Sequence, residues 1–177
     1  MTDVLTPEQR RLNMRRIRGR DTKPELLLRR GLHSRGLRFR LYRSDLPGRP
    51  DLVFPLRKAV VFIHGCFWHG HGCALCKAPA TRAEFWTSKI ARNAERDQIA
   101  SSELMKAGWR VLTVWECAMR GPGRMLTREV VDRCEAFIRV SKARTREIKA
   151  SAPSFTPSVP KLRRKSRNHG RELTVLV

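Results

Sequence analysis

One short stretch, "HGCFWHGHGC" at residues 64–73, gathers three histidines, two cysteines and two adjacent aromatic residues. Histidine nitrogen and cysteine sulfur are the ligands that zinc prefers, four of them in a structural site. A further cysteine ends a predicted strand beside the strand that leads into this stretch. We therefore expect a closed, structural zinc site formed by Cys66, His71, Cys73 and Cys117. A Cys73-x-x-Cys76 pair is a competing arrangement, and a small core of unligated thiols is the structural alternative.

A second group of residues could hydrolyse a phosphodiester. Asp51 begins a predicted strand in "GRPDLVF", and carboxylate oxygen suits Mg²⁺, which stabilises the charge that develops during attack on phosphate. Histidine is the residue type that most readily exchanges a proton near neutral pH, so His69, which is not in the expected zinc set, could act as general base. Each of these residues also has a structural explanation. An aspartate after proline is often a turn residue, and His64 could simply form a hydrogen bond at a strand end. Glu25 completes a capping box with Thr22.

The elements that must position these residues follow from hydrophobic periodicity and from capping and turn residues. Their order is helix, strands, helix, strand, helix, which indicates a compact α/β domain. The buried run "AVVFI" is the best candidate for a central strand. We predict a helix over 20–36, a hairpin over 37–54, a strand over 58–65, a helix over 81–108, a strand over 109–119 and a helix over 126–144.

Charge is the outstanding feature of the composition. With 38 Lys+Arg and 16 Asp+Glu the net charge is +22, so a polyanion, nucleic acid first, is the expected partner. A membrane surface is less suitable, because no basic segment pairs with a clean apolar helical face. We divide the chain into a basic, DNA-binding segment (1–20), a domain (21–141) and a tail (142–177). The tail holds ten Lys/Arg and two Glu, and we expect it to be disordered.

Composition and candidate residues leave three functions open. They are a magnesium-dependent nuclease, a non-catalytic DNA-binding protein stabilised by structural zinc, and an RNA-binding protein. The start of the chain lacks the apolar segment of a secretory signal, and the longest apolar run is too short to span a bilayer. Five cysteines, an odd number, argue against a disulfide framework. These observations favour a cytoplasmic protein.

Five segments together resemble the Vsr family of very short patch repair endonucleases: "DTKPELLLRRGLHSRGLRFR", "LPGRPDLVF", "VVFIHGCFWHGHGC", "PATRAEFWTSKIARNAERDQ" and "GWRVLTVWECAMRG". The resemblance covers about residues 8–121. It implies a restriction-endonuclease-like mixed sheet flanked by helices. It also implies nicking of double-stranded DNA 5′ of the thymine in T:G mismatches that arise from deamination of methylated cytosine. A monomer at the bacterial nucleoid, with mismatch-repair proteins as candidate partners, is the expected setting.

The resemblance also implies a role for each matching residue. Asp51 matches the magnesium-binding aspartate and His69 the general base. Ile63 stands where threonine is usual, and it would still serve if its backbone carbonyl is the second magnesium ligand. The other matches are His64 and Glu25 as supporting active-site groups, Cys66, His71, Cys73 and Cys117 as zinc ligands, and Phe67, Trp68 and Trp86 as an aromatic wedge in the base stack. From the residues alone, Trp86 could instead pack against Ile90, and Phe67 and Trp68 could cap the zinc.

Overall fold

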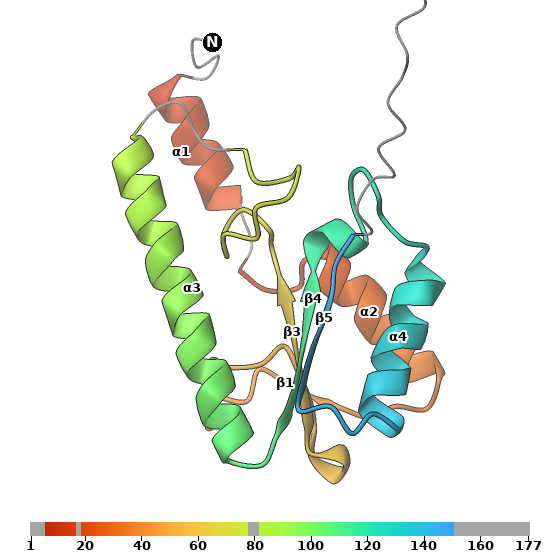
Figure 1. Ribbon diagram of the computed structural model, residues 1–177. Helices are drawn as coiled ribbons and strands as arrows, with labels where there is room; N and C mark the ends of the chain where they lie inside the picture. The colour runs from red at the N-terminus through yellow and green to blue at the C-terminus, as the bar shows by residue number, and fades with distance from the viewer. Residues whose placement is uncertain (1–5, 17–18, 78–81, 151–177) are drawn as a thin grey trace, which may run out of the picture.

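A computed structural model describes residues 6–16, 19–77 and 82–150 of the chain (Figure 1). The described ranges contain five strands and four helices, and two short 3-10 turns each follow a strand. In chain order the elements are α1 (Pro7–Arg16), α2 (Lys23–Ser34), β1 (Arg40–Leu41), β2 (Leu52–Phe54), η1 (Pro55–Arg57), β3 (Ala59–His64), α3 (Ala83–Lys106), β4 (Arg110–Trp115), η2 (Glu116–Ala118), α4 (Thr127–Arg139) and β5 (Thr145–Ile148).

The strands form one mixed sheet in the order β1-β2-β3-β4-β5. β1 and β2 pair antiparallel, as the predicted hairpin requires, and β2 also pairs antiparallel with β3. β3, β4 and β5 run parallel. β3 and β4 are the central parallel pair, and their near-continuous apolar sequences match a position covered on both faces. The mixed sheet flanked by helices is therefore confirmed.

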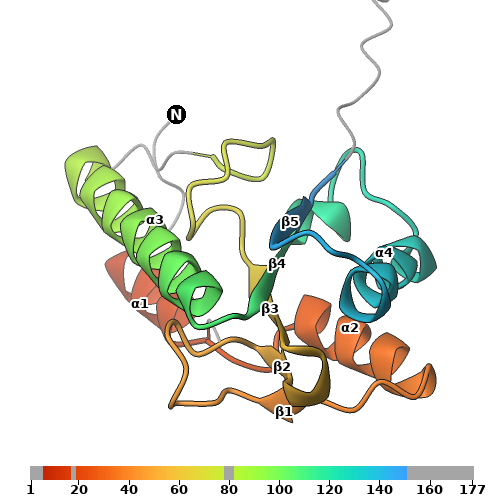
Figure 2. The ribbon, with the colours of Figure 1, turned by 60° about the horizontal axis from the view of Figure 1, so that its bottom comes forward.

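Helices cover both faces of the sheet (Figure 2). α2 and α4 pack on one face, where Leu28 and Phe137 meet Val61 of β3. α3 covers the other face, where Leu104 packs with Val60. Neighbouring residues of a strand point to opposite faces, so β3 supplies both cores and is held firmly between them. The rigid end of this strand is where the histidine stretch begins.

The C-terminal part of the fold differs from the expected tail at 142–177. Residues 145–148 form β5, which pairs with β4 from Val111↔Thr145 to Val114↔Ile148. Ile148 is the one buried residue of this edge strand, so it lacks the apolar alternation that predicts a strand. The folded part thus continues to Ala150, and only residues 151–177 of the expected tail lie outside the described residues.

At the other end, the segment 1–20 that we expected to be a basic DNA-binding arm contains α1, which we did not predict as a helix. Both views place α1 on the side of the sheet that α3 covers (Figures 1 and 2). No helix within the described ranges combines the length and apolar character that crossing a bilayer requires.

Candidate active site

The parallel register of β3 and β4 sets the position of the site. His64 ends β3 directly opposite Trp115, which ends β4. A cleft of about 580 Å³ lies at this end of the sheet. Its lining includes all four predicted catalytic residues, the predicted site residues Ile63 and Trp68, and two acidic residues that we did not predict. These residues are Glu25, Asp51, Ile63, His64, Trp68, His69, Asp97 and Glu116. Residues far apart in the sequence thus meet at one strand end.

Asp51 precedes β2 and faces the end of β3. Its Oδ2 accepts a hydrogen bond of 2.7 Å from the N–H of Ile63. Burial raises the pKa of Asp51 from its ordinary 3.8 to about 6, and the Ile63 N–H only partly offsets this. A carboxylate whose charge is poorly compensated fits a hard cation such as Mg²⁺. Ile63 also lines the cleft, which is consistent with a role for its main chain there.

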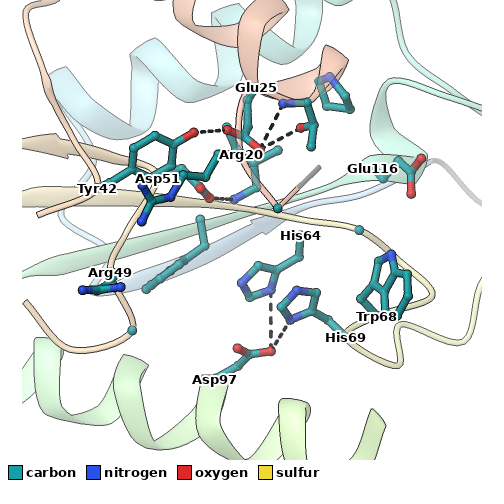
Figure 3. A pocket seen from close by; sticks show the side chains of 17 residues that line it. Arg20, Glu25, Tyr42, Arg49, Asp51, His64, Trp68, His69, Asp97 and Glu116 are labelled. Carbon is teal, nitrogen blue, oxygen red and sulfur yellow. Dashed lines mark hydrogen bonds and ion pairs between the residues drawn. The ribbon is translucent and has the colours of Figure 1, made fainter. Parts of the chain in front are cut away.

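His64 and His69 form a stacked pair, with ring centroids 3.9 Å apart and planes 5° from parallel. Asp97 of α3 holds this pair: its Oδ2 lies 2.5 Å from Nδ1 of His69 and 4.0 Å from Nδ1 of His64 (Figure 3). Burial, helped by the neighbouring His69, lowers the pKa of His64 to about 4. His64 is therefore neutral at pH 7, and His69 has the orienting carboxylate that a general base needs.

Asp97 is a candidate site residue that our sequence analysis missed. It continues a stripe along α3 in which Ala100 and Leu104 are buried against the sheet. Asn93 lies one turn before Asp97 and donates a hydrogen bond of 2.9 Å to the carbonyl of Trp68. The stripe becomes polar where the helix passes the end of the sheet. This change from apolar to polar on one helical face is the signal that could have revealed Asp97.

Glu25 is a buried carboxylate at the start of α2. Its oxygens accept hydrogen bonds from the hydroxyls of Thr22, at 2.8 Å, and Tyr42, at 2.6 Å, and from the guanidinium of Arg29. The capping box that competed with a catalytic role is present. Glu25 also lines the cleft, and its charge contributes to the raised pKa of Asp51. The capping and active-site explanations are therefore compatible.

The four predicted zinc ligands come together behind this cleft. The ligand atoms of Cys66, His71, Cys73 and Cys117 all lie within 4.8 Å of one another, and Nδ1 of His71 is 3.5 Å from Sγ of Cys117. A tetrahedral zinc site places its ligand atoms roughly 3.3–3.8 Å apart, so this Cys/His cluster could close around the ion. Cys76 stays outside the cluster, and its thiol donates to the carbonyl of Cys66 at 3.0 Å.

The three predicted wedge residues also meet. The ring centroid of Phe67 lies 5.1 Å from that of Trp68 and 5.5 Å from that of Trp86, and the two tryptophan rings are 5.9 Å apart. All three are partly exposed, and Trp68 lines the cleft. Lys89 lies over both tryptophan rings, at 5.6 and 5.5 Å from their centroids. An exposed aromatic group with a cation beside it suits stacking on bases near a phosphate backbone.

Comparison with known proteins identifies the family. A family model described as DNA mismatch endonuclease Vsr matches residues 2–75. The chain is 49% identical over 138 residues to the DNA mismatch endonuclease Vsr of Escherichia coli K12, covering 78% of this chain and 88% of that protein. It is 50% identical over 128 residues to the type II nicking enzyme V.XorIIP of Xanthomonas oryzae pv. oryzae, covering 72% and 94%. This chain belongs to the Vsr family.

Membership of the Vsr family confirms the predicted resemblance and the predicted endonuclease. The range matched by the Vsr family model contains Asp51 and the His64–His69 pair. Asp97 and Cys117 lie C-terminal to that range, and the folded sheet brings them to the same strand end. The individual roles of these residues stay predictions that depend on the geometry given above.

Proposed function

We propose that this protein is a magnesium-dependent endonuclease that nicks double-stranded DNA 5′ of the thymine in T:G mismatches arising from deamination of methylated cytosine. Such a nick would initiate very short patch repair. The observation that carries this proposal is that the partly buried Asp51, whose pKa is raised, and the Asp97-bound His69 line the same cleft. The names of its relatives, a DNA mismatch endonuclease and several nicking enzymes, agree with it.

The chain's own residues suit hydrolysis of a phosphodiester. Asp51 and the main-chain carbonyl of Ile63 would hold Mg²⁺, which when bound supplies stabilisation of the charge developing on the phosphate. Nδ1 of His69 faces Asp97, so Nε2 is the nitrogen left to take a proton from the attacking water. Asp97 then stabilises the resulting imidazolium. Neutral His64 supports the face of His69 without adding a competing charge.

Recognition of the mismatch would fall to the aromatic residues. A mismatched pair is stacked less well than its neighbours, so opening the stack there costs less than elsewhere. Inserted rings recover part of the few kcal/mol that unstacking a base step costs. Phe67 and Trp68 lie on the loop that a zinc ion at the Cys/His cluster would hold rigid, and Trp86 lies on α3 beside them. Zn²⁺ would therefore be structural and would also stabilise the wedge.

The remaining expectations follow from charge and from the family. A net charge of +22 suits binding to DNA and would bring the protein to the nucleoid of the bacterial cytoplasm, where we expect it to act as a monomer. Mismatch-repair proteins are the candidate protein partners.

A strand-specific nicking assay tests the proposal. T:G and matched duplexes, labelled on either strand, are incubated with and without Mg²⁺, using wild type and the near-isosteric Asp51→Asn variant. We expect one nick, 5′ of the mispaired thymine, that needs Mg²⁺ and falls by more than about 1,000-fold in the variant. DNA binding by the variant should persist. Nicking at the wild-type rate by Asp51→Asn would overturn the mechanism. Equal cleavage of matched DNA would overturn the substrate, and tight wild-type binding without cleavage would indicate a non-catalytic protein.

A further inference from the structure

Four rings form a continuous series from the catalytic cleft to the Cys/His cluster. His69 stacks on His64, as described above. His64 meets Trp115 edge-on, with centroids 5.4 Å apart and planes at 72°. Trp115 in turn stacks on His71, at 4.2 Å and 18°. Within the described ranges, Trp115 is the one ring that contacts both a catalytic histidine and a predicted zinc ligand.

Strand register explains why this contact exists. His64 and Trp115 are paired across the parallel strands β3 and β4. Cys66 and Cys117 lie two residues beyond the ends of these strands, and the N–H of Cys117 donates a hydrogen bond of 3.3 Å to Sγ of Cys66. Trp115 is 9% exposed and packs with these two cysteines. The same two strand ends therefore carry the catalytic pair and the Cys/His cluster, with the indole between them.

Hydrogen bonding does not explain a tryptophan at this position. Nε1 of Trp115 is buried, and no hydrogen-bond partner reaches it from the described part of the chain. A buried donor without a partner opposes folding, so a role of Trp115 in packing alone would be served as well by a ring without an N–H. What distinguishes the indole is its area, which is large enough to contact His64 at its edge and His71 on its face.

We propose that Trp115 is a positioning residue. It packs between the Cys/His cluster and His64, and so holds the catalytic histidines in place when the cluster is ordered. This inference rests on the proposed function, and it identifies Trp115 as the residue through which the Cys/His cluster would support catalysis. Asp97 fixes the Nδ1 edge of His69, and His64 fixes its face. Trp115 fixes His64 in turn, backed by His71. Without the indole, His69 keeps its carboxylate partner but loses the support that sets the plane of its ring.

The test compares Trp115→Leu and Trp115→Phe in the full-length, zinc-loaded protein. Leucine removes the flat ring, whereas phenylalanine keeps a smaller one. We expect kcat on a T:G duplex to fall about 10- to 100-fold in Trp115→Leu, since small displacements of a general base slow catalysis steeply. KM and bound zinc should be unchanged, and Trp115→Phe should recover part of the rate. If Trp115→Leu does not fold, Trp115→Phe alone carries the test with a smaller decrease.

Trp109→Leu is the matched control, because Trp109 is equally buried, at 8% exposed, and precedes the opposite end of the same strand. It should destabilise the fold yet leave kcat of the folded protein unchanged. NMR of the imidazole nitrogens supplies a readout apart from activity: the His64 and His69 signals should shift in Trp115→Leu and not in Trp109→Leu. Unchanged signals with unchanged kcat would overturn the proposal, and so would loss of zinc from Trp115→Leu. If the wild type does not nick DNA, the proposed function fails, while the NMR comparison still decides the role of Trp115.

Discussion

The Cys/His cluster and the catalytic cleft share one loop and the ends of β3 and β4, yet they differ in chemistry. The cluster is closed and rich in sulfur, and two of its cysteines are buried. The cleft is open and offers carboxylate oxygen and imidazole nitrogen. Closed sites of four ligands hold structure, whereas catalysis needs an open position. The three histidines within eight residues are thus divided between the cleft and the cluster by what each one packs against.

A reversal of the chain at Gly70 separates the two groups. Its φ of +65° is a backbone conformation that side chains other than glycine rarely adopt. A Cβ there would also come within 2.8 Å of Ile90 on α3. On one side of the reversal, His69 stacks on His64, and on the other, His71 stacks on Trp115. Glycine is therefore the residue that this reversal requires.

The largest expected effect comes from breaking the Cys/His cluster. Cys117→Ser removes a thiolate from a buried position, so zinc should be lost. Stability should fall by on the order of 5 kcal/mol, because binding of a structural zinc is coupled to folding. Nicking should be lost as well, since the strand ends also carry the catalytic histidines. Zinc content and thermal denaturation measure this effect.

Cys76→Ser is the matched control, because this thiol bonds to the carbonyl of Cys66 from outside the cluster. It should keep its zinc and most of its stability. Equal zinc loss in both variants would contradict the proposed ligand set and favour the Cys73-x-x-Cys76 arrangement.

His69 and His71 lie two residues apart, yet we expect their substitution to affect different properties: the rate of nicking for His69 and zinc binding for His71. His69→Ala should lower kcat by about 100- to 10,000-fold, the usual contribution of a general base, and leave bound zinc unchanged. His71→Ala should release zinc, and its activity should fall together with its stability. Single-turnover nicking and metal analysis of the two proteins separate these effects. Zinc loss from His69→Ala would move that residue into the ligand set.

Sequence patterns and three-dimensional packing contributed differently to the two groups. The grouping of the Cys/His set was predictable because its four residues come from one short loop and one strand end. Spacing alone left the Cys73-x-x-Cys76 arrangement open, and the family resemblance selected the set. The polar residues of the cleft were predictable only in part. Asp97 is one of many charged residues on a long helix, and its role depends on how α3 crosses the sheet. β5 was missed for a related reason, since an edge strand with a single buried residue carries no apolar alternation.

The Asp51→Asn variant, in magnesium-free protein, tests whether the ionised Asp51 carboxylate lowers the stability of the fold. The Cys/His cluster is expected to raise that stability. Burial raises the pKa of Asp51 in the fold to about 6, from 3.8. The folded state therefore favours the protonated form. Stability from this group is fully present below pH 3.8, is lost as pH rises toward 6, and stays lost above it. The variant should be more stable than wild type at pH 7 by on the order of 3 kcal/mol.

Urea denaturation of both proteins between pH 5 and 8 measures this difference, which should grow as pH rises through about 6 and then level off. Mg²⁺ should raise the stability of wild type and not that of Asp51→Asn, because only the carboxylate provides the site for the ion. A difference that does not change with pH would show that Asp51 ionises normally in the fold.

The smallest effect should come from Asp97→Ala, which leaves both the cluster and the general base in place. His69 keeps its stacking on His64 but loses the carboxylate that selects its tautomer and orients its ring. We expect kcat to fall about 30-fold, near 2 kcal/mol, with unchanged KM and zinc. Added acetate, which could occupy the space of the missing carboxylate, should restore part of the rate. A decrease as large as that of His69→Ala would mean that Asp97 takes part in the proton transfer itself, because orientation alone leaves the base able to accept a proton.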